Sequence, residues 1–277
     1  MNKHARERRD AIVLHLVIVP LAIVWLFPIW FMVVFATMPE NAIFSPDILL
    51  VPSTEFLNNF RELEEDAGFL RTIFNSVLVA VIYTALSVLL TSMAGWALAR
   101  YRFAGRGAVA ALVLGTMTLP YFVVVIPQFI MVARDFNLIN TWFALIVPPL
   151  FNSLGVLFMR QAFLMLPSEL FDAARVEGVS EWKIFRYVAM PMAAPTIAAL
   201  SIVLFLFSWN NYLWPLLIAT RPDMMTAPVA LGSLIGVTRV SWGSIMVGSV
   251  LLTVPMLILF IALQRYFISG ITSGAVK

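Results

Sequence analysis

The stretch Thr72–Ala99 reads TIFNSVLVAVIYTALSVLLTSMAGWALA, and it carries no charged residue. A run of about 20 apolar residues is long enough to cross the hydrocarbon core of a bilayer. In lipid such a segment has to be a helix, because an open strand would leave its amide groups without hydrogen-bond partners. This stretch therefore predicts a transmembrane helix and makes the chain an integral membrane protein.

Five further stretches of comparable length and polarity flank this one, and together they predict an all-α integral membrane protein of six transmembrane helices. The first stretch has a basic start, as secretory signal peptides do. It is too long for a signal peptide, and no A-x-A cleavage site follows at the expected place, so we interpret it as a retained anchor. The five stretches are 11–37, 107–133, 141–164, 195–219 and 243–263.

The composition supports a membrane location. Apolar residues make up 61% of the 277 residues, and charged residues make up only 12%. Soluble domains typically contain about 45–50% apolar and about 25% charged residues, so most of this surface must face lipid. The sequence has no cysteine, which excludes disulfides, thiolate metal sites and cysteine nucleophiles. The only histidines, His4 and His15, lie near the N-terminus, so we expect no histidine-based metal or catalytic centre deep in the fold.

The distribution of lysine and arginine predicts the orientation, since cytoplasmic loops carry an excess of these residues. With the N-terminus inside, only 5 of the 18 basic residues fall outside, and the opposite orientation would reverse this ratio. We therefore expect a cytoplasmic N-terminus at 1–10, a transmembrane domain at 11–270 and a cytoplasmic C-terminal tail at 271–277. The long outer loops, 38–71 and 220–242, would either touch a soluble partner or be ordinary connections. The five outer basic residues are Arg61, Arg71, Arg134, Arg221 and Arg239.

The segment between the fourth and fifth spans, about 166–191, is the least membrane-like stretch after the first outer loop. Ser168 is a candidate N-cap, and Gly178 can adopt the left-handed conformation that ends a helix. Ser180 can cap a second helix, which Pro191 helps to end. The pattern predicts two short amphipathic helices joined by a glycine corner on the cytoplasmic face. From amphipathicity alone, a helix pair lying in the lipid interface is an equal alternative.

This segment resembles the EAA loop of ABC importer permeases. The family pattern is E-A-A, three residues, G, nine residues, I, one residue, L-P, and every spacing is kept here with conservative replacements. The basic turn at 99–105, the Trp209-Asn210 pair and the tail at 270–277 are also similar to the MalG-type branch, which serves binding-protein-dependent sugar uptake. The similarity covers nearly the whole chain. The matching residues of the loop are Asp172, Ala173, Ala174, Gly178, Val188, Met190 and Pro191.

The resemblance implies that Asp172, Ala173, Ala174, Gly178 and Pro191 couple the chain to a cytoplasmic ABC ATPase dimer. It also implies a second, MalF-like permease subunit, an extracytoplasmic solute-binding protein and a location in the bacterial inner membrane. The sequence contains no G-x-x-x-x-G-K-[ST] phosphate-binding loop. We therefore expect a transport subunit, not an enzyme, that binds no cofactor itself, with ATP and Mg used by the partner ATPase. Membrane lipid surrounds it, and we expect no nucleic-acid partner.

Polar and aromatic side chains within the spans are candidates for a substrate pathway, because polar groups are costly in lipid. Amides and hydroxyls can bind sugar hydroxyls, and aromatic faces can stack on sugar rings. Hydrogen bonding between helices, or anchoring of aromatic rings at the membrane interface, is the alternative for each of them. The candidates are Thr118, Gln128, Asn152, Ser153, Trp209, Asn210, Asn211 and Tyr212.

These observations predict the permease subunit of an ATP-driven importer with a mono- or oligosaccharide cargo. Glycerol phosphate or another small polar solute is the nearest alternative, since Arg221 and Arg239 could serve a phosphate or, equally, contact the binding protein. An ion-driven secondary transporter would show ionisable residues at mid-membrane and an internal repeat. A membrane enzyme would show clustered His, Asp or Glu there. Neither pattern is visible in the sequence.

Overall fold

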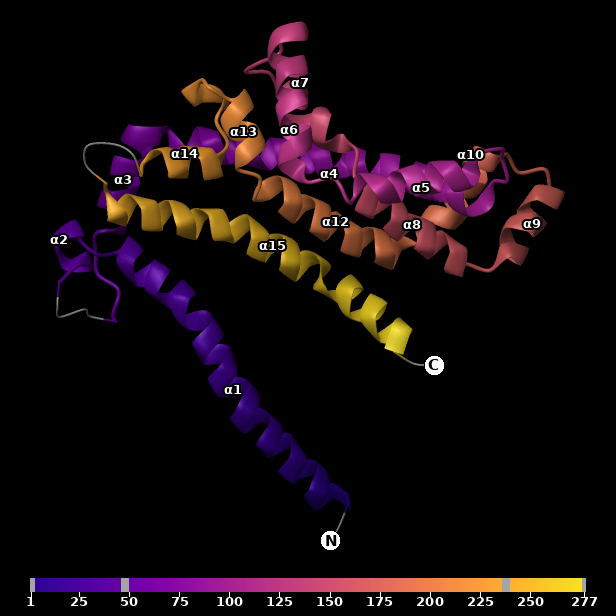
Figure 1. Ribbon diagram of the computed structural model, residues 1–277. Helices are drawn as coiled ribbons and strands as arrows, with labels where there is room; N and C mark the ends of the chain where they lie inside the picture. The colour runs from indigo at the N-terminus through magenta and orange to yellow at the C-terminus, as the bar shows by residue number, and fades with distance from the viewer. Residues whose placement is uncertain (1–2, 46–49, 236–239, 276–277) are drawn as a thin grey trace. The chain divides into compact units, whose positions relative to one another are not determined.

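The computed structural model describes residues 3–45, 50–235 and 240–275, and the regular structure within these ranges is helical (Figure 1). The predicted all-α fold is thereby confirmed. The chain divides into two compact units, which we describe separately. The first comprises Met1–Phe69 and Leu231–Thr253, and the second comprises Leu70–Ala230 and Val254–Lys277.

The first unit is organised around one buried amide. Its helices are α1 (Lys3–Ala36), α2 (Glu40–Ile43), α3 (Phe56–Ala67) and the start of α15 (Trp242–Ala275). Asn59 of α3 donates to the carbonyl oxygens of Ala36 and Met38 over 3.0 and 2.9 Å, and so fixes the chain where α1 ends. A Cβ on Gly243 would come within 2.6 Å of the Asn59 amide nitrogen. The glycine therefore allows α15 to approach α3 closely.

The second unit contains the long helix α4 and most of the shorter helices. Tertiary packing within it includes contacts of α8 with both α5 and α12. Its helices are α4 (Phe69–Arg100), α5 (Arg106–Thr116), α6 (Tyr121–Ile130), α7 (Trp142–Ile146), α8 (Ser153–Met165), α9 (Ser168–Val176), α10 (Glu181–Ile184), α11 (Met190–Met192), α12 (Ala194–Trp209), α13 (Leu213–Ile218) and α14 (Ala227–Ser233), the last of which runs into the first unit.

Three helices are by themselves long and apolar enough to cross a membrane: Ala11–Ala36 of α1, α4, and Trp242–Ala262 of α15. Three further candidates are pairs of helices that are bent by 97°, 52° and 80° at short breaks. These pairs are α5 with α6, α7 with α8, and α12 with the helical segment before it. By length and composition the described chain thus holds up to six spans, which agrees with the predicted number. The predicted third and fourth spans, however, are broken helices and not continuous ones.

The breaks fall at residues that cannot continue a helix. Pro120 follows the break between α5 and α6, and a proline disfavours the helical conformation of the residue before it. Pro148 and Pro149 form a single 3₁₀ turn before α8 begins. The predicted fifth span, 195–219, also divides, because α12 ends at Trp209 and α13 starts only at Leu213.

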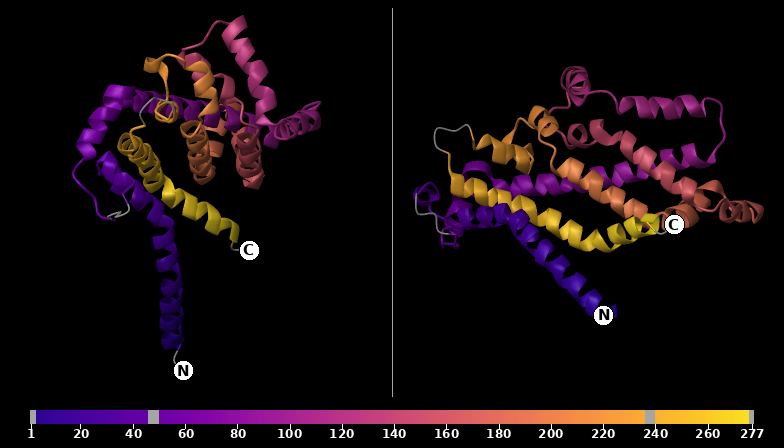
Figure 2. Two further views of the ribbon diagram at one scale, coloured as in Figure 1. Left: turned by 60° about the vertical axis from the view of Figure 1, so that its left-hand side comes forward. Right: turned by 60° about the horizontal axis from the view of Figure 1, so that its bottom comes forward.

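Glycines let α4 and α8 pack closely within the second unit. A Cβ on Gly95 of α4 would lie 2.8 Å from the backbone nitrogen of Arg160. A Cβ on Gly155 of α8 would lie 2.9 Å from Cγ2 of Thr91. Small residues at helix contacts are typical of membrane bundles, where close backbone approach provides the packing energy. This packing places the C-terminal ends of α4 and α8 beside α9 and α10, at the end of the unit away from α7 and α13 (Figures 1 and 2).

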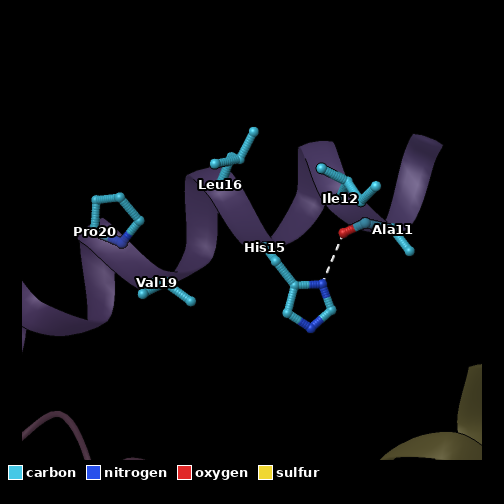
Figure 3. A pocket seen from close by; sticks show the side chains of 6 residues that line it. All are labelled: Ala11, Ile12, His15, Leu16, Val19 and Pro20. Carbon is cyan, nitrogen blue, oxygen red and sulfur yellow. Dashed lines mark hydrogen bonds between the residues drawn. The ribbon is translucent and has the colours of Figure 1, made fainter. Parts of the chain in front are cut away.

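One face of α1 presents an apolar surface with a single histidine. The hollow in Figure 3 is lined by six side chains that all come from α1. His15 donates from Nδ1 to the carbonyl oxygen of Ala11 over 2.7 Å, so one ring nitrogen is satisfied within the helix itself. The other side chains of this face are Ile12, Leu16, Val19 and Pro20, and such a surface suits lipid or another apolar helix.

Candidate functional site between α8 and α12

The segment 166–191, which we call the α9–α10 loop, begins with a cap different from the predicted one. The prediction that Ser168 is the N-cap is wrong: Ser168 is the first helical residue, and Pro167 occupies the cap position with ψ 128° and no capping side chain. Proline has a fixed φ near −65°, which suits the entry to a helix, so α9 starts directly behind it. Glu169 lies in the first turn, where the helix dipole favours an anion.

Gly178 forms the predicted corner. Its φ is +77°, in the left-handed region that other residues rarely adopt. The Gly178 N–H donates to the Arg175 carbonyl and the Val179 N–H to the Ala174 carbonyl, both over 3.0 Å. These two bonds are those of a Schellman motif, with glycine at C′. The carbonyl groups at the end of α9 are therefore satisfied within the loop, and the turn has a defined shape.

The second helix of the loop is longer than its α-helical part. Ser180 occupies its N-cap position, as predicted, although its side chain makes no capping bond. After α10 the chain continues through a π-helical turn, Phe185–Ala189, into α11. Pro191 lies in this last helical turn, and the chain bends by 80° before α12. The helical segment thus extends through Pro191 to Met192.

Aromatic rings form the base on which α9 stands. Phe171 is 1% exposed, and its ring centre lies 5.0 Å from that of Trp96 on α4. Trp96 also contacts Phe163 of α8 edge-on at 5.3 Å, and it lies 6.2 Å from Phe185. Edge-to-face ring pairs contribute about 0.5–1.5 kcal/mol beyond the burial of their area. The base therefore ties α4, α8 and both helices of the loop together.

Arg100, the last residue of α4, completes this base. Its Nη2 donates to the carbonyl oxygens of Phe163 and Leu166, both over 2.6 Å, and so satisfies the C-terminal end of α8. Its guanidinium carbon lies 4.5 Å above the ring of Phe171, within the range of a cation–π contact. In the sequence Arg100 counts among the inner basic residues and belongs to the basic turn at 99–105, and neither observation predicts this role. A basic residue at the end of a span was the only signal available.

A chain of polar contacts crosses the glycine corner. Arg175 donates from Nη1 to Asp172 over 2.8 Å and from Nε to Glu181 over 2.7 Å. The hydroxyl of Tyr101, just beyond α4, donates to the other oxygen of Glu181 over 2.9 Å. The Arg175 hydrogen bond lowers the pKa of Glu181, with help from Tyr101, while burial raises the pKa of Tyr101. Glu181 is therefore a carboxylate and Tyr101 a neutral donor at ordinary pH.

The outer face of α9 remains open within the chain. Asp172 and Ala173 are exposed, whereas Ala174 is half-buried and packs against the core. Val176 is 90% exposed and Leu170 is 47% exposed. The small Ala173 side chain would allow another surface to approach the helix backbone closely. The loop thus combines a rigid inner base with an accessible outer face that carries the carboxylates of Glu169 and Asp172.

Four of the candidate pathway residues make hydrogen bonds at the broken helices. Asn152 caps α8, since its side-chain oxygen accepts from the Gly155 N–H over 2.8 Å. Ser153 bonds the hydroxyl of Thr116 over 2.6 Å, and Gln128 donates to the Pro148 carbonyl over 2.9 Å. Thr118 is exposed and bonds only within its own turn, to Gly115. These are local and interhelical contacts of the kind that the sequence analysis kept as the alternative.

The other four candidates lie around the break after α12. Trp209 is 2% exposed and stacks on Phe205, with ring centres 5.6 Å apart. Asn211 accepts from the Trp214 N–H over 3.4 Å. Asn210 is exposed, and Tyr212 is 42% exposed. The side chains of Asn210 and Tyr212 are therefore the more accessible ones of this group.

The comparisons with known proteins agree with this arrangement. Residues 87–273 match the family described as "Binding-protein-dependent transport system inner membrane component". The chain is 38% identical over 260 residues to the arabinooligosaccharides transport system permease protein AraQ of Halalkalibacterium halodurans, with 93% of each chain covered. It is 29% identical over 257 residues to the sn-glycerol-3-phosphate transport system permease protein UgpE of Salmonella typhi, with 90% of this chain and 91% of that one covered.

A solved structure has the same fold. It is the crystal structure of a bacterial ABC transporter involved in the import of the acidic polysaccharide alginate. The TM-score is 0.81 at 19% identity, with 96% of this chain and 99% of that chain covered. The family match spans both the α9–α10 loop and the broken helices. The chain therefore belongs to the inner-membrane components of binding-protein-dependent transport systems, and it is a multi-pass permease subunit of an ABC importer.

Proposed function

We propose that this permease subunit imports a carbohydrate and receives the force for transport at α9, which docks on a cytoplasmic ABC ATPase dimer. One observation carries the proposal: the exposed face of α9, with Asp172 and Ala173, stands on the buried base of Phe171. A helix fixed in this way transmits a displacement into the bundle and does not absorb it. Gly178 and Pro191 set the directions in which the loop leaves α9 and enters α12.

The orientation of the chain in the membrane is inferred from the basic residues around this loop. Several basic side chains gather around the α9–α10 loop and the turn between α4 and α5, and such an excess favours the cytoplasmic side. We therefore place the loop and the N-terminus in the cytoplasm and the protein in the bacterial inner membrane. These basic residues are Arg100, Arg102, Arg106, Arg175, Lys183 and Arg186.

The chain needs partners for its task. ATP and Mg would be bound and used by the ATPase dimer, and a second, MalF-like permease would complete the pathway across the membrane. An extracytoplasmic solute-binding protein would deliver the cargo. Family membership supports a binding-protein-dependent system.

One relative and two accessible side chains support an oligosaccharide cargo. AraQ, the relative that is 38% identical, is named for arabinooligosaccharides, which supports an oligosaccharide. Asn210 and Tyr212 offer an amide and a ring to such a ligand, and both side chains are accessible. Asn152 is a weaker contact candidate, since its oxygen already caps α8.

Glycerol phosphate is a second candidate because UgpE is also a relative along most of the chain. A phosphate would need a free cation on the outer side. Arg221 is already bound by Asp223 through two bonds of 3.0 and 2.6 Å, which weighs against it as a phosphate ligand. Arg239 lies outside the described residues.

The docking role can be tested with two variants, Gly178→Pro and Ala173→Trp, in the complete transporter. We expect both to insert normally but to separate ATP hydrolysis from uptake of radiolabelled arabinotriose, or of sn-glycerol 3-phosphate if that is the cargo. The matched controls are Gly107→Pro, in the first turn of α5 where proline is tolerated, and Ala108→Trp on the exposed face of α5. Full uptake by both loop variants would refute the docking role.

The absence of cysteine from the sequence makes the orientation directly measurable. With Ala173→Cys, the introduced thiol is the only one in the chain. We expect a membrane-impermeant maleimide to label it in inverted vesicles from cells that lack the ATPase subunits, and not in intact spheroplasts. Labelling from the outer side would overturn the orientation and, with it, the docking proposal.

A further inference from the structure

We propose that Tyr101 is a positioning residue, which ties the second helix of the α9–α10 loop to α4 and thereby passes the motion of the docked loop into the membrane span. This inference rests on the proposed docking of α9. It assigns a task to a hydroxyl group that lies outside the loop itself.

The polar contacts form an unbroken path from the exposed face of α9 to α4. Asp172 contacts Arg175 at 2.8 Å, Arg175 contacts Glu181 at 2.7 Å, and Glu181 accepts from the Tyr101 hydroxyl at 2.9 Å. The Tyr101 N–H continues the last turn of α4 by donating to the Ala97 carbonyl over 3.1 Å. The first residue of the path would face the ATPase, and the last belongs to the longest helix of the second unit.

The chemistry of the path suits positioning more than stabilisation. The side chains of Arg175, Asp172 and Glu181 are 35%, 66% and 42% exposed, so water screens their ion pairs. The bond from a neutral hydroxyl to a carboxylate is charge-assisted, short and directional. Arg175 accordingly sets the angle between α9 and α10. Tyr101 sets the position of these two helices on α4.

Two neighbouring residues at the end of α4 each hold one helix of the loop. Arg100 holds α9 through the ring of Phe171, and Tyr101 holds α10 through Glu181. Without the Tyr101 bond, α4 is attached to the loop through the ring contacts of Trp96 and Arg100, and it could turn about these contacts while the loop moves. With the directional bond added, the end of α4 must follow the loop in position and in direction. Loss of the Tyr101 hydroxyl should therefore weaken the response of α4 while α9 stays docked.

The test uses the complete transporter and two single-cysteine probes. Val81→Cys, 52% exposed on α4, carries a bimane and reports the response of α4 to MgATP with vanadate. Ala173→Cys carries a benzophenone and reports docking by crosslinking to the ATPase. In each background we compare Tyr101→Phe with Tyr187→Phe, a control within the α9–α10 loop whose side chain is 66% exposed.

We expect Tyr101→Phe to reduce the nucleotide-driven change in the equilibrium constant between the two bimane states about tenfold. A factor of this size corresponds to the free energy of one lost hydrogen bond to a charged group. Crosslinking from position 173 should persist, and Tyr187→Phe should behave like the parent. Glu181→Gln should weaken the response at least as strongly, because it removes the Arg175 ion pair as well as the carboxylate that accepts from Tyr101, and Tyr101→Phe should add little in that background.

The outcomes separate the two proposals. Crosslinking in the parent together with an unchanged bimane response in Tyr101→Phe would refute the role of Tyr101 and leave docking intact. An absence of crosslinking in the parent would refute the docking of α9 itself. If Tyr101→Phe assembles poorly, Glu181→Gln and Arg175→Gln decide the question by the same two measurements. Equal responses in these two variants would refute the role of Tyr101, because only Glu181→Gln alters the Tyr101 contact.

Discussion

The two ends of α4 hold their neighbouring loops by different kinds of contact. Near its N-terminus, Asn75 donates to the carbonyl oxygens of Asp223 and Met225 over 2.9 and 2.8 Å, and Ser76 accepts from the Ala227 N–H over 2.8 Å. At its C-terminus, Arg100 bonds the Leu166 carbonyl where the loop begins, but it reaches α9 through a ring contact, and Tyr101 reaches α10 through an ion-paired carboxylate.

This difference indicates which of the two loops moves during transport. Bonds to backbone groups fix the course of the chain itself, so the 3₁₀ turn at residues 222–224 and the segment after it are held directly on α4. Ring contacts and bonds between side chains hold α9 and α10 to the end of α4, so the loop and that end can move together. We infer that one end of α4 holds a stationary loop, and that the other end holds a loop that is displaced during transport.

The largest effect is expected from Phe171→Ala, which removes the ring on which α9 stands. Truncation of a buried phenylalanine costs about 3–5 kcal/mol, and here the loss falls on one local element. We expect the amides of α9 to exchange hydrogen much faster in the variant, measured by mass spectrometry. Leu170→Ala, at a side chain that is 47% exposed, should change this exchange little. Equal exchange in the two variants would mean that the aromatic base does not hold α9.

Asn75→Leu should weaken the attachment of residues 223–225 to the N-terminal end of α4. It removes two bonds to part-buried carbonyl groups, and the loss of one such hydrogen bond costs about 0.5–1.5 kcal/mol. We expect the thermal unfolding temperature in detergent to fall clearly, with little change in the exchange of α9. Asn58→Leu is the matched control, because Asn58 is exposed and bonds only Glu55. A drop of the same size in the control would show that the substitution, and not the site, is responsible.

Gly155→Ala tests whether the middle of α4 and its neighbour α8 form one rigid body between these ends. The new Cβ would lie 2.9 Å from Cγ2 of Thr91, and overpacking of this kind costs about 1–3 kcal/mol. We expect a lower unfolding temperature, and partial recovery when Thr91→Ser removes that methyl group. Without recovery in the double variant, the contact with Thr91 cannot be the cause.

The smallest effect is expected from Gly178→Ala. No atom lies within 4 Å of the position that the new methyl group would take, so the cost is only that of the +77° φ, about 1–2 kcal/mol. We expect faster exchange of the amides at 177–180, and a milder change with Gly178→Asn, since asparagine tolerates this conformation. Gly107→Ala, with open space and a helical backbone, should have no such effect. Identical exchange in Gly178→Ala and the parent would remove the conformational argument.

The features that the sequence predicted correctly depend on local chemistry. The apolar runs define the spans, and the Gly178 corner is made by bonds that reach no further than five residues along the chain. The failed N-cap at Ser168 is also local: the preceding proline already supplies a suitable entry to the helix. The breaks within the third and fourth spans were marked by Pro120 and by Pro148-Pro149, but apolarity alone does not distinguish a straight helix from a broken one.

The rest of the candidate site depends on contacts between distant residues. Arg100 bonds carbonyl groups 63 and 66 positions away, and Tyr101 bonds a carboxylate 80 positions away. No periodicity or spacing connects such residues. The same limit affects the pathway candidates: that Gln128 bonds Pro148, or that Ser153 bonds Thr116, depends on how the broken helices pack. The docking and pathway assignments stay predictions until the experiments above are done.

The π-helical turn at Phe185–Ala189 lies at the end of the nine-residue interval that the family pattern keeps between Gly178 and Val188. Each bond of such a turn encloses one residue more than an α-helical bond, as in Met190 N–H to Phe185. Nine residues separate Gly178 from Val188, and the turn begins within this interval and ends at Ala189, just after Val188. Removing one residue from the turn would let it relax to an α-helix, whereas removing one residue from an α-helical part of the interval would rotate everything beyond it by about 100°. The length of the interval thus determines the direction in which the chain enters α12.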